Sequence, residues 1–184
     1  MKYAYYPGCS LHSTGKDYDI SAQAVCQALG IELLEIPDWI CCGASSGHST
    51  SKLLSVALPV KDLLSAQEMG LDTAVCCAAC YSRLRLANVT MSRVTASHPN
   101  AAEEQAAVDE VVGRSYRGEV GVKHLLEIIT REYGLDALRD KVQSAPKGRA
   151  LEGLKAAAYY GCLLVRPPEA VAFDDPLRIA SAPP

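Results

Sequence analysis

Short apolar segments alternate with longer amphipathic ones along the first half of the chain. Three segments are short and rich in aromatic or branched side chains, as strands are, at residues 2–6, 31–36 and 72–75. Three others have the length and periodicity of helices, at residues 17–29, residues 51–69 and the run around Cys80. On the first of these helices, Ile20, Ala24 and Leu29 are expected to share one face. Strands that alternate with helices form right-handed crossovers, so the pattern predicts an α/β fold with a parallel sheet and flanking helices.

The second half of the chain predicts further helices and then a change of character. Helical patterns occur at residues 101–112, 122–133 and 135–142. Residues 144–149 are rich in helix breakers and charge, which is typical of a linker. Residues 154–160 then predict another strand.

That last strand repeats the first. Ala-Tyr-Tyr-Gly-Cys162 resembles Ala-Tyr-Tyr-Pro-Gly-Cys9 near the start of the chain, which indicates two related units in tandem. The chain continues too briefly past Cys162 to hold the second unit in full. We therefore expect a first cysteine-rich domain at residues 1–145, followed by a linker and the truncated start of a second copy at residues 146–184.

Composition and charge exclude several classes of function. Of the 184 residues, 49% are apolar and 21% charged, as expected for a folded globular protein. The formal net charge of -3 leaves no basic excess for a phosphate backbone, so nucleic acid is not an expected partner. The N-terminus lacks the apolar region of a signal peptide, and no apolar stretch approaches the roughly 18 residues that span a membrane. We therefore expect a cytoplasmic protein with no transmembrane segment.

The eight cysteines are the strongest functional signal. In a reducing compartment, clustered cysteines more often bind metal or carry out redox chemistry than form structural disulfides. Five of them fall in three groups, namely Cys9, Cys41-Cys42 and Cys77-Ala-Ala-Cys80. Each group follows a predicted strand, and the carboxyl ends of parallel strands share one edge of a sheet. The three groups are therefore expected to converge on one site.

Thiolate ligands restrict the choice of metal. Soft thiolates select iron-sulfur clusters, zinc or copper(I), whereas magnesium and calcium need oxygen ligands. Four thiolates complete a tetrahedral zinc site or an ordinary cubane cluster. A fifth has a role if it bridges two irons, so the surplus favours an unusual cluster and leaves zinc as the alternative. Gly43 would let the backbone approach the metal, and amides at the start of the Cys80 helix would stabilise a negative cluster.

Four stretches of the sequence resemble a known family. They are Tyr-Tyr-Pro-Gly-Cys9-Ser-Leu-His, Ile-Pro-Asp-Trp-Ile-Cys41-Cys-Gly-Ala, Cys77-Ala-Ala-Cys-Tyr-Ser-Arg-Leu and Tyr-Tyr-Gly-Cys162-Leu-Leu-Val-Arg-Pro-Pro-Glu. The arrangement of the cysteines is similar to the cysteine-rich CCG domain, and the residues around them are similar to those of the B subunit of heterodisulfide reductase. The likeness covers nearly the whole chain.

The resemblance implies a cofactor, a reaction and partners. The cofactor is a non-cubane 4Fe-4S cluster with a thiolate that bridges irons, held by Cys9, Cys41, Cys42, Cys77 and Cys80. In the family, two such domains each hold a cluster, and a disulfide such as that of coenzymes M and B is reduced between them. Electrons arrive through the ferredoxin-like C subunit and the flavin-containing A subunit of heterodisulfide reductase. This chain is then part of a disulfide oxidoreductase and carries one of the two clusters, and it is not expected to turn over alone.

The remaining cysteines and two histidines have separate expectations. Cys76 stands where the resemblance leads us to expect proline, so it is a spare thiol, and Cys162 has no partner cysteines after it. Cys26 lies within a predicted helix and is expected in the core. His12 and His48 flank the cysteine groups and are candidate proton donors to a leaving thiolate.

Two other functions stay open at this point. One is electron transfer by an iron-sulfur protein, like the CCG-containing subunits of lactate- or glycolate-oxidising complexes. The other is an interaction module stabilised by zinc.

Overall fold

The described part of the chain forms one sheet of four parallel strands in the order β2-β1-β3-β4. The structure is a computed structural model that describes residues 1–92, 100–145, 153–157, 161–171 and 173. The strands are β1 (Lys2–Tyr6), β2 (Glu32–Glu35), β3 (Thr73–Val75) and β4 (Val122–His124). The predicted α/β class, the parallel sheet and its first three strands are confirmed.

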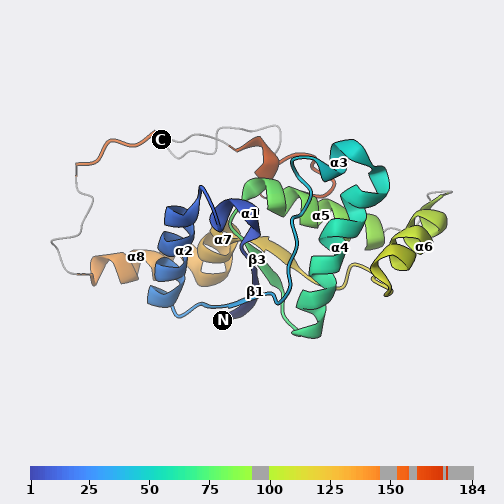
Figure 1. Ribbon diagram of the computed structural model, residues 1–184. Coiled ribbons are helices and arrows are strands. Elements are labelled where there is room, and N and C mark those ends of the chain that lie inside the picture. The colour runs from blue at the N-terminus through green and yellow to red at the C-terminus, as the bar shows by residue number, and fades with distance from the viewer. Residues whose placement is uncertain (93–99, 146–152, 158–160, 172, 174–184) are drawn as a thin grey trace.

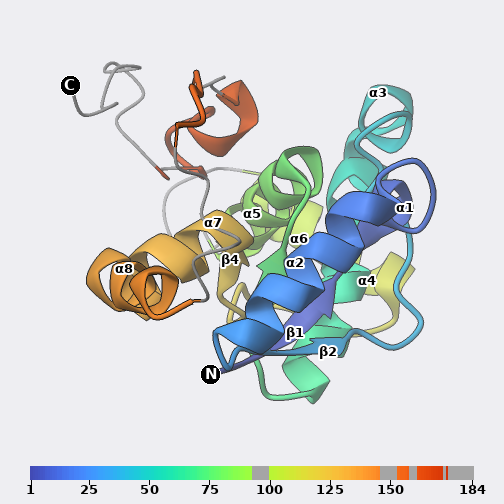
Figure 2. The same ribbon diagram turned by 90° about the vertical axis from the view of Figure 1, so that its left-hand side faces the viewer.

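Helices cover both faces of this sheet (Figures 1 and 2). One face carries α2 (Lys16–Ala28) and α7 (Leu125–Glu127), which continues through the π-helical segment η2 (Ile128–Gly134) into α8 (Leu135–Gln143). The other face carries α4 (Lys52–Glu68) and α5 (Ala78–Ser92), and α6 (Ala101–Val112) packs against α4. Right-handed crossovers explain this division, because β2 lies on one side of β1 and the later strands lie on the other. None of the helices described is long and apolar enough to cross a membrane.

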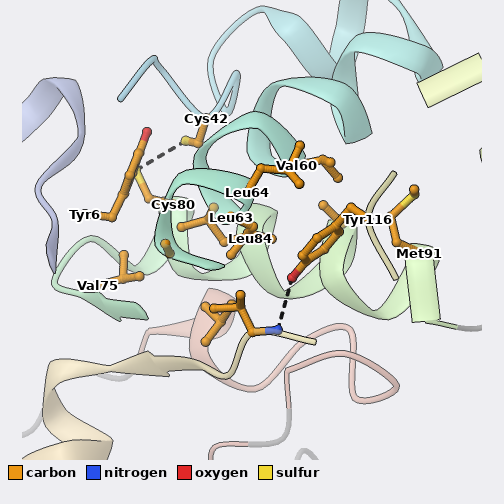
Figure 3. Close-up of a cluster of buried hydrophobic side chains, with 14 of the residues drawn as sticks. Tyr6, Cys42, Val60, Leu63, Leu64, Val75, Cys80, Leu84, Met91 and Tyr116 are labelled. Carbon is orange, nitrogen blue, oxygen red and sulfur yellow. Dashed lines mark hydrogen bonds between the residues drawn. The ribbon is translucent and has the colours of Figure 1, made fainter. Parts of the chain in front are cut away.

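Strand β1 supplies side chains to both layers of the core. Successive side chains of a strand point to opposite faces, so Tyr3 and Tyr5 pack on the α2 side, while Ala4 and Tyr6 pack on the α4 and α5 side. Figure 3 shows Tyr6 in this second cluster, beside the buried residues of α4 and α5. The sheet is therefore held between two apolar layers. The loops that follow the strands emerge at its carboxyl edge.

The prediction of a helix over residues 122–133 is wrong for its first three residues. Val122, Lys123 and His124 form β4, which pairs in parallel with β3, and only then does the chain turn helical. A segment of three residues is too short to show a strand period. Its conformation comes from backbone pairing with β3 and from burial of Val122, both of which are tertiary effects.

The prediction of which face of α2 is buried is also wrong. The buried residues of α2 are Ala22 and Cys26, whereas Ile20 is exposed. The small side chains at these two positions pack in the same cluster as Tyr3 and Tyr5. Cys26 is a core residue, as expected.

Residues 161–171 pack against α5. Residues 154–157 are not a strand, and residues 146–149 of the expected linker, 158–160 and 174–184 lie outside the described part. The 3-10 turn η4 (Cys162–Leu164) contacts α5, and Nε of Arg85 donates a hydrogen bond to the Ala170 carbonyl across 2.8 Å. The division into a first domain and the start of a second stays a prediction.

Candidate metal centre

The three cysteine groups follow the three strands that the sequence predicts. Cys9 lies in the short helix α1 (Gly8–Leu11) directly after β1. Cys41 and Cys42 lie in the loop after β2, before the short helix α3 (Gly47–Thr50). Cys77 lies between β3 and α5, and Cys80 lies in the first turn of α5. All three groups therefore emerge at the carboxyl edge, where the strand order reverses between β1 and β3 and where ligand sites form in parallel sheets.

Two pairs of sulfur atoms lie close together at this edge. The Sγ atoms of Cys9 and Cys41 are 3.9 Å apart, and both side chains are exposed. The Sγ atoms of Cys42 and Cys80 are 3.3 Å apart and buried, as Figure 3 shows. Cys77 is half-buried. Within the described residues, no three or more Cys, His, Asp or Glu side chains already surround a single ion position.

Two of the sulfurs at this edge, those of Cys42 and Cys77, lie in an environment that favours thiolates. Hydrogen bonds from the Cys80 side chain and from the amides of Cys80 and Ala79 lower the pKa of Cys77 to about 5. A hydrogen bond with the Cys80 side chain and one from the Ala44 amide lower the pKa of Cys42 to about 7. The pKa of Cys80 is raised, because its side chain is hydrogen-bonded to both of these sulfurs. Amides at the N-terminus of a helix stabilise negative charge, so α5 contributes to this environment.

The cysteines outside the expected ligand set behave differently. Burial raises the pKa of Cys26 to about 11 and that of Cys76 to about 12, so both stay thiols near neutral pH. The Cys76 side chain lies on the α2 side of the sheet, where Tyr5 Oη is 3.7 Å from its Sγ. Cys162 is exposed in η4. Cys42 and Cys77 therefore differ from these two core thiols in the direction of the pKa shift, whereas the pKa values of Cys41 and Cys80 are raised.

Glycine at position 8 allows the backbone to pass close to the buried sulfurs. Gly8 has φ +70°, and a Cβ atom there would lie 3.0 Å from the Cys80 sulfur and 3.2 Å from the Tyr6 ring. Gly43 also has a positive φ, +74°, directly after Cys42. Both positions favour glycine because other residues rarely adopt this conformation.

The two candidate proton donors lie beside the cysteine loops. Nε2 of His12 is 3.6 Å from Oε1 of Glu35, and its ring meets that of Trp39 edge to face, with centroids 5.0 Å apart. The Trp39 indole N–H donates to the same Glu35 oxygen across 2.9 Å. Nδ1 of His48 is 3.4 Å from the Gly43 carbonyl oxygen. His12 is therefore part of an exposed cluster with a carboxylate, and His48 lies against the loop after Cys42.

Sequence reasoning missed three residues that support the site. The Tyr6 hydroxyl donates to the Ile40 carbonyl across 2.7 Å, beside Cys41. Asp62 is a buried acid within the apolar face of α4, and a charge in such a run is the signal that could have revealed it. His124 lies in β4 and contacts the carbonyl of Cys76, but no local pattern marks it.

Comparison with known proteins identifies the class of this domain. Residues 3–85 match the family described as the cysteine-rich domain, CCG. That segment holds all five expected ligands, together with β1, β2 and β3. Residues 3–85 of this chain therefore contain a cysteine-rich domain of the CCG family, as the motifs indicated.

Individual relatives are distant, and the similarity extends over most of this chain. It is 28% identical over 173 residues to the membrane anchor subunit of the 8-methylmenaquinol:fumarate reductase of Wolinella succinogenes, covering 94% of this chain and 56% of that protein. It is 24% identical over 170 residues to a protein of Archaeoglobus profundus that is named as like the B subunit of heterodisulfide reductase, covering 92% and 54%. It is 25% identical over 170 residues to the B subunit of the ferredoxin/F(420)H(2)-dependent CoB-CoM heterodisulfide reductase of Methanosarcina acetivorans, covering 90% and 52%. The chain thus spans about half the length of these relatives.

Proposed function

We propose that this chain holds a non-cubane 4Fe-4S cluster and serves as one component of a heterodisulfide reductase-type complex. The proposed ligands are Cys9, Cys41, Cys42, Cys77 and Cys80. The observation that supports this best is the arrival of three cysteine groups at one sheet edge, with sulfur pairs 3.9 and 3.3 Å apart. Similarity to the proteins of Archaeoglobus profundus and Methanosarcina acetivorans, both named for the B subunit of heterodisulfide reductase, supports the choice of complex.

The chemistry of the donor set fits such a cluster. Every proposed ligand is a sulfur, which suits iron-sulfur clusters and not hard cations. The lowered pKa values of Cys42 and Cys77 favour the thiolate forms that bind metal. A cluster bound here would supply electrons one at a time. Cys42 and Cys80 would hold it from the buried side, where Gly8 lies close to the Cys80 sulfur, and Cys9 and Cys41 would hold it from the exposed side.

The proposed reaction is reduction of a disulfide, such as the mixed disulfide of coenzymes M and B, to two thiols. This change consumes two electrons and two protons. We propose that a ferredoxin like the C subunit of heterodisulfide reductase and a flavoprotein like its A subunit deliver the electrons. His12, held near Glu35 on the exposed side, is the proposed donor of a proton to the leaving thiolate, and His48 is the second candidate. Because this chain carries one cluster in the proposal, a second cluster domain would complete the enzyme.

A second candidate function is electron transfer without disulfide chemistry. The relative from Wolinella succinogenes is named as part of a quinol:fumarate reductase, not of a disulfide reductase. An iron-sulfur electron-transfer subunit of a lactate- or glycolate-oxidising complex is another protein with this kind of function. Assembled with its partner subunits, the protein is expected to oxidise a reduced viologen dye when a thiol disulfide is added. If the dye is oxidised only when an electron acceptor of another class is added, and not when a disulfide is added, the result would favour the electron-transfer function.

The cluster itself is tested by metal analysis of the chain purified without oxygen. We expect about four irons and four acid-labile sulfides per chain, with visible absorption typical of a cluster. Cys42→Ser should abolish this content, because Cys42 is buried against Cys80. Cys162→Ser, which removes an exposed thiol outside the proposed ligand set, should leave it unchanged. Stoichiometric zinc without sulfide would overturn the proposal in favour of the zinc-stabilised module.

A further inference from the structure

His124 reaches the cysteine site from a different part of the chain. It ends β4, where it pairs with Val75 of β3, the residue just before Cys76. The side chain is 6% exposed and lies outside residues 3–85, which match the cysteine-rich family. Strand β4 thus brings a buried imidazole beside the loop that carries Cys77 and Cys80.

The hydrogen bonds of the ring define one tautomer. The Leu126 amide donates to Nδ1 across 3.2 Å, so Nδ1 carries a lone pair. Nε2 lies 2.8 Å from the carbonyl oxygen of Cys76, which can only accept, so Nε2 must carry the proton. Burial also lowers the pKa of His124, which favours this neutral form. The imidazole therefore donates to the peptide group that joins Cys76 to Cys77.

The same ring contacts the far end of the cysteine turn. It meets the ring of Tyr81 edge to face, with centroids 5.6 Å apart. Tyr81 follows Cys80 directly, and its amide donates to the Cys77 carbonyl across 2.9 Å. His124 thus contacts the residue before Cys77 and the residue after Cys80.

We propose that His124 is a positioning residue that fixes the Cys77-Ala-Ala-Cys80 turn through its hydrogen bond to the Cys76 carbonyl and its contact with Tyr81. This inference rests on the proposed function, because the turn supplies two of the proposed cluster ligands. Outer hydrogen-bond partners of metal ligands typically contribute about 10- to 100-fold to metal affinity. A comparable loss in cluster retention is the expected effect of removing the donor at Nε2.

Two conservative variants separate positioning from a merely structural role. His124→Asn keeps an acceptor near Nδ1, and with it the cap of α7, but removes the donor to the Cys76 carbonyl. His124→Gln places an amide donor near the Nε2 position and loses the cap. A third variant, His124→Phe, keeps the ring against Tyr81 and loses both hydrogen bonds. We expect His124→Gln to retain the native properties of the turn and His124→Asn and His124→Phe to lose them.

The first readout uses the protein without metal. Residue-resolved alkylation by limiting iodoacetamide, followed by mass spectrometry, measures the reaction rate of Cys77, with the exposed Cys9 as the internal reference. We expect the ratio of the two rates to change at least about threefold in His124→Asn and His124→Phe and to stay near the native value in His124→Gln. Nitrogen-15 NMR of the imidazole should show the Nε2–H tautomer.

The second readout is the cluster itself, measured as iron retained and as reduction potential. His124→Asn and His124→Phe should lose iron about 10-fold or more faster than the native chain and should shift the reduction potential. His124→Gln should have native iron retention and a native potential. The inference would be overturned if His124→Asn retained iron as the native chain does. It would also be overturned if iron retention fell equally in His124→Asn and His124→Gln. If the native chain binds no cluster, the proposed function fails, and the alkylation rates still decide whether His124 positions Cys77.

Discussion

The Ile40 amide donates a hydrogen bond to Oδ1 of Asp62 across 2.8 Å, and Asp62 is completely buried. The Tyr6 hydroxyl donates to the carbonyl of the same Ile40. The residue that precedes Cys41 is therefore held from both sides, by α4 and by the end of β1. This gives the loop with two adjacent cysteines a fixed backbone without any metal.

Asp62 makes the stability of the metal-free protein depend on pH. Burial raises the pKa of Asp62 from 3.8 to about 7, although the Ile40 amide and Lys61 act in the opposite direction. Because the folded pKa lies above the unfolded one, the stability linked to this proton is fully present below pH 3.8 and is lost as the pH rises through 7. The gap between the two values corresponds to roughly 4 kcal/mol at most.

Asp62→Asn should therefore flatten this dependence. The amide keeps an acceptor for the Ile40 N–H and does not ionise. Urea unfolding at pH 5 and pH 8 measures the free energy of unfolding of both proteins. The native chain should lose more stability than the variant between the two pH values. Parallel losses would show that Asp62 does not titrate in this window.

A methyl group at Gly8 should disrupt the cysteine site. In Gly8→Ala the new Cβ meets the Cys80 sulfur at 3.0 Å and the Tyr6 ring at 3.2 Å, in addition to the strain of a positive φ. Gly30→Ala is the matched control, because Gly30 has φ +69° and nothing within 4 Å of the added atom. Left-handed strain alone costs about 1 to 2 kcal/mol. Unfolding and iron analysis should show this cost in both variants, and a further loss of stability and of iron only in Gly8→Ala.

Equal iron contents in the two glycine variants would contradict this reasoning. They would mean that the close approach of α1 to Cys80 has no bearing on the cluster.

The convergence of the cysteines could be predicted from sequence because it depends on local features. Each cysteine group follows a short apolar strand, and parallel strands bring their carboxyl ends together whatever the intervening sequence. The same reasoning does not reveal that Cys41 is exposed while Cys42 is buried against Cys80. That difference arises from the loop between Ile40 and Gly43, whose conformation depends on remote contacts.

The supporting residues could not be predicted for a related reason. His124 ends a strand of three residues that exists only because β3 lies beside it. Asp62 accepts from an amide 22 positions earlier in the chain. Neither contact leaves a periodic trace in the sequence, so both belong to tertiary structure.

A buried network at the other end of α5 should affect stability and not the cysteine site. The Tyr116 hydroxyl donates to Oδ1 of Asn88 across 2.5 Å and accepts from the Val120 amide. Tyr116→Phe leaves both groups buried without this partner and should lower the free energy of unfolding by about 1 to 3 kcal/mol. Tyr133→Phe, at a more accessible tyrosine, is the control. Iron content should be the same in both variants, and a loss of iron in Tyr116→Phe alone would link this network to the cluster.

His12 should matter for disulfide reduction and not for cluster binding. His12→Gln removes a proton donor that lies 3.6 Å from Glu35, three residues after Cys9. A positioned general acid typically contributes about 100-fold or more to a rate, so the variant should reduce disulfides about 100-fold more slowly in the assembled complex. Arg139→Gln, which breaks an exposed ion pair with Asp136, is the control for a change of surface charge and should keep the native rate. Iron content and absorption spectrum should be native in both. A native rate in His12→Gln would leave His48, beside the Gly43 carbonyl, as the candidate to change next.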